Sequence, residues 1–109
     1  MKAMKTLDRE FMKGAEALGL LDDKLFRQAI EAYNFQIGLA EKLRENITRI
    51  GVTITIPVGR DNEKTVSNPS IADLNKAELL AQKIRLELDR KIEKAQMAAS
   101  AGEEDVEDL

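Results

Sequence analysis

The sequence of 109 residues contains neither cysteine nor histidine. Disulfide bonds and thiolate metal sites are therefore excluded, and the commonest metal ligand and general base of proteins is missing. Aromatic residues make up only 4% of the chain, and there is no tryptophan. At this length a core of Leu, Ile, Ala and Met is thin for a chain that folds alone. We expect a non-enzymatic protein of one domain at most, without a cofactor.

Long apolar runs are also missing, and no segment approaches the roughly 18 residues that a membrane span needs. The first eleven residues, MKAMKTLDREF, are charged and lack the apolar stretch of a secretory signal. We therefore expect no membrane partner and a cytoplasmic location.

Two segments in the first half of the chain carry apolar residues at helical spacing. A short helix is predicted over residues 7–18 and a long helix over residues 22–50. The stripe of the long helix follows spacings of 4, 3, 4, 3, 3, 4 and 3, close to a heptad seam. The residues expected to cap or end these helices are Thr6, Gly19, Asp22 or Asp23, and Gly51.

The next segment is the only one with a period of two, and it predicts a β-hairpin over residues 52–67. A two-stranded hairpin is marginal in water by itself. Its apolar face must therefore pack on helices of this chain or of another copy. Asn68 and Pro69 then predict a long helix over residues 69–99, because Asn caps orphan amides and Pro fits the first helical position.

The predicted fold is mainly α, with two long antiparallel helices joined by a β-hairpin and a short N-terminal helix, in one domain over residues 1–101. Each long helix spans roughly 40 Å, so the shape is elongated. A lone antiparallel pair leaves each apolar stripe half covered, and we expect homo-oligomeric assembly through these stripes. The expected interface residues are Phe26, Ile30, Tyr33, Ile37, Ile47, Val52, Ile54, Ile56, Ile84 and Leu88.

Charge is concentrated at the end of the chain, where the last seven residues hold five acids and no base. Outside them, 15 of the 20 acidic residues remain against 17 basic residues, so the body is near neutral. Residues 102–109 are predicted to form an acidic disordered tail. Such a tail either solubilises the protein or docks on a basic partner.

Four basic residues at the start of the chain follow spacings of three, four and four: Lys2, Lys5, Arg9 and Lys13. On one continuous helix they would share a side and could contact phosphates. The alternative is a solvated face opposite the apolar stripe. No aromatic residues are interleaved with these bases, so base stacking is not expected.

The order of these segments resembles the small subunit of the phage DNA-packaging terminase, in its P27-type branch. The resemblance covers residues 20–88 and is carried by the stretch around ALGLLDD, the long helix, the short β-run and the strand leading into SNPSIADLNKAELLAQKIRLEL. In that family the last helix continues to an LGLTPxxR-like ending. Here DRKIEKAQMAASAGEEDVEDL follows Leu88 instead.

The resemblance implies a non-catalytic, ring-forming protein that recognises viral double-stranded DNA and recruits or regulates the large terminase subunit during genome packaging in the host cytoplasm. It implies no catalytic, cofactor-binding or metal-binding residues. The long helices would form the ring, the four basic residues would contact DNA, and the acidic tail would contact the large subunit. The near-neutral body favours an alternative, a helical scaffold protein with no nucleic-acid role.

Overall fold

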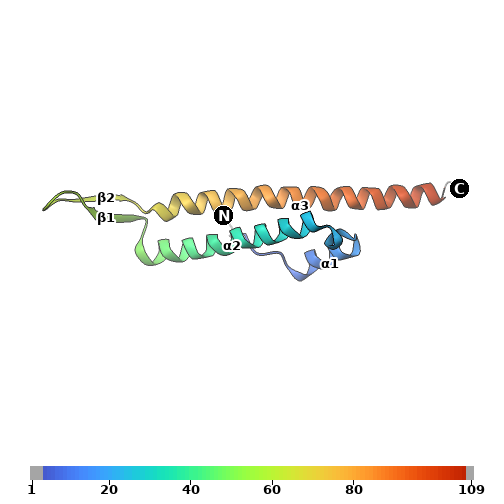
Figure 1. Cartoon of the computed structure of the whole chain (residues 1–109), viewed down its shortest axis with the longest axis horizontal. Helices are drawn as coiled ribbons and strands as arrows, with labels where there is room; N and C mark the ends of the chain where they lie inside the picture. Colours follow the sequence, from blue (N-terminus) through green and yellow to red (C-terminus); the bar gives the residue numbers. More distant parts are fainter. Residues whose placement is uncertain (1–3, 108–109) are drawn as a thin grey trace.

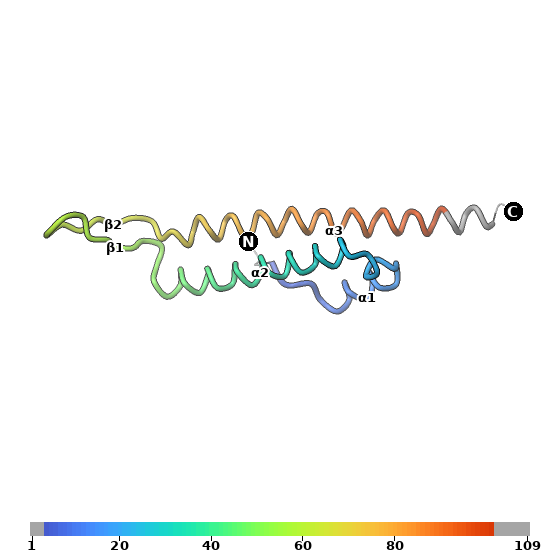
Figure 2. The backbone as a smooth tube through the Cα atoms, in the orientation of Figure 1, coloured from blue at the N-terminus to red at the C-terminus, as the bar shows by residue number. Residues whose placement is uncertain are grey.

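The computed structural model describes residues 4–107, with side chains described for residues 4–101. Two long helices lie antiparallel and side by side, a β-hairpin extends beyond one end of the pair, and the last helix extends beyond the other (Figures 1 and 2). The molecule measures 84 × 26 × 19 Å. The predicted mainly α fold with one hairpin is confirmed. The elements in chain order are α1 (Arg9–Ala17), the 3₁₀ turn η1 (Leu20–Asp22), α2 (Lys24–Ile50), β1 (Thr53–Pro57), β2 (Glu63–Ser67) and α3 (Pro69–Glu107).

Helix α1 begins at Arg9, two residues later than predicted. Its N-cap is Asp8 rather than Thr6. The Asp8 carboxylate accepts a hydrogen bond from the Phe11 N–H at 2.8 Å, which satisfies one of the unpaired amides of the first turn.

The residues before Asp8 are held in a non-helical path by two hydrogen bonds to α2. The Tyr33 hydroxyl donates to the Lys5 carbonyl at 2.8 Å, and the Leu7 N–H donates to Asn34 Oδ1 at 3.1 Å. These contacts fix the N-terminal segment against α2, and they explain why the helix cannot start at residue 7.

The connection between α1 and α2 is a tight turn. Gly19 has a φ of +74°, a conformation that favours glycine, and the predicted helix end there is confirmed. The turn then continues as η1, which the sequence pattern did not predict. Helix α2 consequently starts at Lys24 instead of residue 22, with the Asp23 carboxylate accepting from the Leu25 N–H at 2.9 Å.

The other end of α2 and the start of α3 meet at Asn68, which is buried. Its Oδ1 accepts from the Ser70 N–H at 3.0 Å, so the predicted cap of α3 is confirmed. Its Nδ2 donates to the Gly51 carbonyl at 2.9 Å and to Asn46 Oδ1 at 3.2 Å. The Asn68 side chain therefore caps α3, and it also links the residue that follows the hairpin to Gly51, which precedes it.

Replacing Asn68 with Ala should lower the free energy of unfolding by about 1–3 kcal/mol, because the cap is removed and the Gly51 carbonyl is left without its partner. Asn68→Ser keeps a capping oxygen and should recover part of this stability. Urea denaturation of both variants measures the difference. An Asn68→Ala variant as stable as the wild type would show that this junction does not hold the hairpin to the helices.

Helix α3 continues to Glu107, so the end predicted at residue 99 and the boundary predicted at Gly102 are wrong. A glycine inside a helix costs only about 1 kcal/mol relative to alanine. The alanines and glutamates around Gly102 favour helix, and they offset that cost. The predicted disordered tail is therefore helical over residues 102–107, while residues 108–109 lie outside the described part of the chain.

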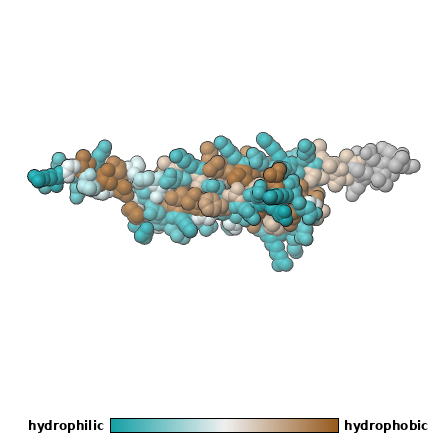
Figure 3. Space-filling view, viewed as in Figure 1, coloured by the Kyte–Doolittle hydropathy of each residue, from teal (hydrophilic) through white to brown (hydrophobic). Residues whose placement is uncertain are grey.

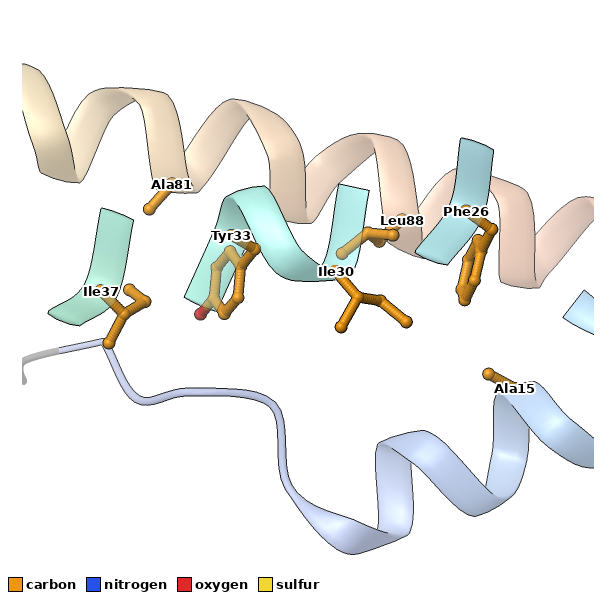
Figure 4. Packing of buried hydrophobic residues seen from close by; sticks show 7 residues of the cluster. All are labelled: Ala15, Phe26, Ile30, Tyr33, Ile37, Ala81 and Leu88. Carbon is orange, nitrogen blue, oxygen red and sulfur yellow. The ribbon is translucent and has the colours of Figure 1, made fainter. Parts of the chain in front are cut away.

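The core lies between α1, α2 and α3 (Figure 4). Helix α2 contributes most of the large side chains, and the parallel rings of Phe26 and Phe11 of α1 have centroids 6.5 Å apart. Arg85 of α3 lies over the Phe11 ring at 4.8 Å and closes the edge of this layer. The buried residues of the central cluster are Ala15, Phe26, Ile30, Tyr33, Ile37, Ala81 and Leu88.

The hairpin pairs β1 with β2 in antiparallel register, with Ile54 opposite Val66. Both side chains are half-buried, whereas Val52 is 63% exposed and the next apolar residues of the same face, Ile56 and Val58, are also exposed. The hairpin lies beyond the end of the helix pair (Figure 1). The helices of its own chain therefore leave most of its apolar face uncovered.

Candidate interaction surfaces

The apolar stripe of α2 that was expected to join copies is used inside the chain. Five of the ten residues assigned to an interface between copies are buried: Phe26, Ile30, Tyr33, Ile37 and Leu88. Helix α3 covers one side of this stripe, and α1 with the N-terminal segment covers what the antiparallel pair would leave open. This corrects the assignment, because these side chains have no surface to offer a second copy. Of the other five, Val52 and Ile56 are exposed, and Ile47, Ile54 and Ile84 are half-buried.

A different apolar surface is open on the opposite face of the α2–α3 pair. Leu43 lies nine residues after Asn34, which places it about 180° around α2 from the side that holds the N-terminal segment. This face is hollowed between the two helices into a recess of about 320 Å³. Leu39, Leu43 and Leu80 form its apolar lining. The full lining is Gln36, Leu39, Leu43, Asp73, Lys76, Ala77 and Leu80.

A second hollow of about 270 Å³ lies on α2 alone, where Asn34 and Lys42 line it together with Phe35, Gly38 and Leu39. The two share Leu39, which is 38% exposed, and the second hollow adds Phe35, which is 67% exposed. Gly38 lies between Asn34 and Lys42 on the helix surface, and it places no side chain in this hollow. We call the first hollow, between the two helices, the α2–α3 recess. Figure 3 shows apolar surface along the long helices and on the hairpin.

A second seam on α2 underlies this surface, and the predicted interface did not include it. It is offset by one residue from the buried seam, and its spacings alternate between four and three in the same way. Its members are Leu25, Ala29, Ala32, Gln36, Leu39, Leu43, Asn46 and Ile50. A helix with two adjacent heptad seams can contact two different neighbours, which the sequence spacing alone was sufficient to indicate.

Helix α3 carries a separate apolar ridge on its outer side. Leu79 and Leu86 are seven residues apart, so they lie on the same side of the helix, and they are 56% and 57% exposed. Leu79 is two residues from the buried Ala81, which turns it about 160° away from the α2 interface. We call this pair the α3 ridge.

The predicted basic stripe is only partly brought together. Arg9 and Lys13 lie one turn apart on α1, and both are exposed. Lys5 is also exposed but precedes the helix, so a continuous helix through these residues is ruled out. Lys2 lies outside the described residues. The structure thus gives α1 two neighbouring cations rather than a stripe of four.

Two other arginines are engaged within the chain. Arg85 forms an ion pair with Asp89 at 3.2 Å, and it also lies 5.9 Å from the centre of the Tyr33 ring. Arg44 of α2 pairs with Glu78 of α3 through a hydrogen bond. The Arg44–Glu78 pair and the contact of Arg85 with Tyr33 help to hold α3 on α2, and both ion pairs leave less free positive charge on the paired helices.

Among residues 4–101, whose side chains the structure describes, no group of three or more carboxylates is arranged to hold a metal ion. None of the described helices has an apolar stretch long enough to cross a membrane. Comparison of the chain with protein-family models, with curated proteins and with solved structures finds no match.

Proposed function

We propose that the chain is the small subunit of a phage DNA-packaging terminase, a non-catalytic protein that forms a homo-oligomeric ring, binds viral double-stranded DNA and recruits or regulates the large subunit. The observation that carries the assembly part is the surface that one copy leaves exposed. A folded monomer of this mass exposes about 6,100 Å², whereas this chain exposes 8592 Å².

The dimensions of the chain also support assembly of several copies. Its radius of gyration is 21.1 Å, while a compact domain of this length has a radius of about 13 Å. The exposed side chains include several large apolar residues on α2, on α3 and on the hairpin. A chain that leaves this much apolar surface uncovered gains stability when copies of it associate.

The terminase part rests on the resemblance over residues 20–88 and on the matching order of elements. A long helix, a hairpin and a second long helix that begins at Asn68-Pro69 follow one another as the resemblance implies. In a ring, the two exposed cations of α1 would be repeated in every copy. A modest charge per chain would then become a belt of positive charge that can contact phosphates.

We expect the double variant Arg9→Ala/Lys13→Ala to bind duplex DNA more weakly than the wild type. The slope of log affinity against log salt should also fall, by about 0.9 for each phosphate that the variant no longer neutralises. Filter binding at several salt concentrations measures both quantities. The matched control is Lys91→Ala/Lys94→Ala, which removes the same charge from exposed positions of α3. An equal weakening in the two variants would contradict a specific role for α1.

The second candidate is a helical scaffold protein with no nucleic-acid role. It is favoured by the near-neutral charge outside the last seven residues and by the separation of Lys5 from the cations of α1. The same assay distinguishes the two functions. A wild-type protein that assembles but retains no duplex DNA at low salt would be a scaffold.

A further inference from the structure

Building on the assembly part of the proposed function, we propose that the α2–α3 recess of one copy receives the α3 ridge of the next copy. The contact joins two different surfaces, and it runs head to tail. Its central side chains are Leu39 and Leu80 in the recess, and Leu79 and Leu86 on the ridge.

The shapes of the two surfaces suit each other. The recess is a hollow between two helices, with an apolar floor and with Gln36, Asp73 and Lys76 on its polar rim. The ridge is a pair of leucines one heptad apart on a single straight helix. Side chains with that spacing pack into the grooves of neighbouring helices, as knobs do in helical bundles.

The occupant is another copy of this chain because each copy carries both halves of the contact. Leu80 faces the recess while the adjacent Leu79 belongs to the ridge, and consecutive helical residues point about 100° apart. A copy that fills the recess of one neighbour therefore keeps its own recess free for another. Such contacts repeat in one direction, and they close into a ring where the rotation between copies allows it.

The exposed area also agrees with two contacts per copy. The chain exposes roughly 2,500 Å² more than a compact monomer of its mass. A standard interface buries about 800 Å² on each partner, so two such interfaces would use about 1,600 Å² of each copy. The uncovered face of the hairpin accounts for part of the remainder.

The test uses two variants that each break one half of the contact. Leu39→Glu places a charge in the recess and leaves the ridge intact, while Leu86→Glu does the reverse. Both positions are solvent-accessible, so each variant should keep the helix content of the wild type by circular dichroism. Thr48→Glu is the control, because it adds the same charge at an exposed α2 position outside both surfaces.

In sedimentation velocity, the wild type and Thr48→Glu should form large species, and each recess or ridge variant alone should be monomeric. An equimolar mixture of Leu39→Glu and Leu86→Glu should form dimers, because the intact ridge of the first fits the intact recess of the second. Those dimers cannot grow, since their remaining surfaces are the damaged ones. The appearance of dimers also demonstrates that both variants are folded.

Two results would overturn this inference and leave the proposed assembly standing: a Leu86→Glu variant that keeps the size of the wild type, or a mixture that stays monomeric although the wild type assembles. A wild type that is monomeric at every concentration would overturn both the inference and the assembly part of the proposed function, and the recess would then belong to a different partner.

Discussion

Phe26→Ala is expected to lower the free energy of unfolding by about 3–5 kcal/mol, the largest effect of any single truncation in this chain. Phe26 is fully buried where α1, α2 and α3 meet, and its ring stacks on Phe11. Removing the ring leaves a cavity between three helices. The other buried residues of the core still hold these helices in place, so the cavity can close only in part. Urea denaturation followed by circular dichroism measures the decrease.

The matched control is Phe35→Ala on the same helix. Phe35 is 67% exposed and lines the second hollow on α2, so its removal should leave the stability of the single chain nearly unchanged. Any effect should depend on protein concentration, because it acts through association. If Phe26→Ala cost less than about 1 kcal/mol, or no more than Phe35→Ala, the buried seam would not be the one that includes Phe26.

Ala81→Leu is expected to cost about 1–3 kcal/mol, because it places a much larger side chain in a close contact between helices. Ala81 is fully buried, and Ala77 of α3 and Ala40 of α2 are also buried. These small residues allow the backbones of the two long helices to approach closely. A leucine at this position must push α2 and α3 apart or adopt a strained rotamer.

The control for this prediction is Ala98→Leu, an exposed position of α3. Leucine and alanine both favour helix, so the control should change stability by no more than about 0.5 kcal/mol. Thermal unfolding of the two variants, compared at the same protein concentration, measures the contrast. A stabilised Ala81→Leu variant would mean that the helices leave a void at this position.

The end of α1, the end of α2 and the start of α3 were predictable because single residues determine them. Gly19 ends the first helical segment through its backbone conformation, and Asn68 with Pro69 starts α3 through a cap and a fixed φ. The starts of α1 and α2 and the end of α3 were not predicted, and at the start of α1 long-range contacts override the local signal. Thr6 is an acceptable cap in isolation, but the hydrogen bonds of Tyr33 and Asn34 hold the chain extended at that point.

The interaction surfaces were harder to predict. The spacing of apolar residues identifies an apolar face of a helix, but it does not identify the element that packs on that face. The seam that includes Phe26 and the seam that includes Leu39 follow the same spacing on the same helix. The positions of α3 and of α1 with the N-terminal segment decide which of them is buried in the chain. The N-terminal segment is held by hydrogen bonds between residues 27 and 28 apart in sequence. The stronger seam was therefore assigned to assembly, although the structure uses it as the core.

Native mass spectrometry of the wild-type chain tests the central claim, that this protein is a unit of a larger assembly. The account predicts a closed species of several identical copies, with no series of intermediate sizes, because head-to-tail contacts leave unfilled surfaces until the ring closes. A monomer that persists as the protein concentration is raised would contradict the account. The exposed recess, ridge and hairpin would then need a partner other than this chain.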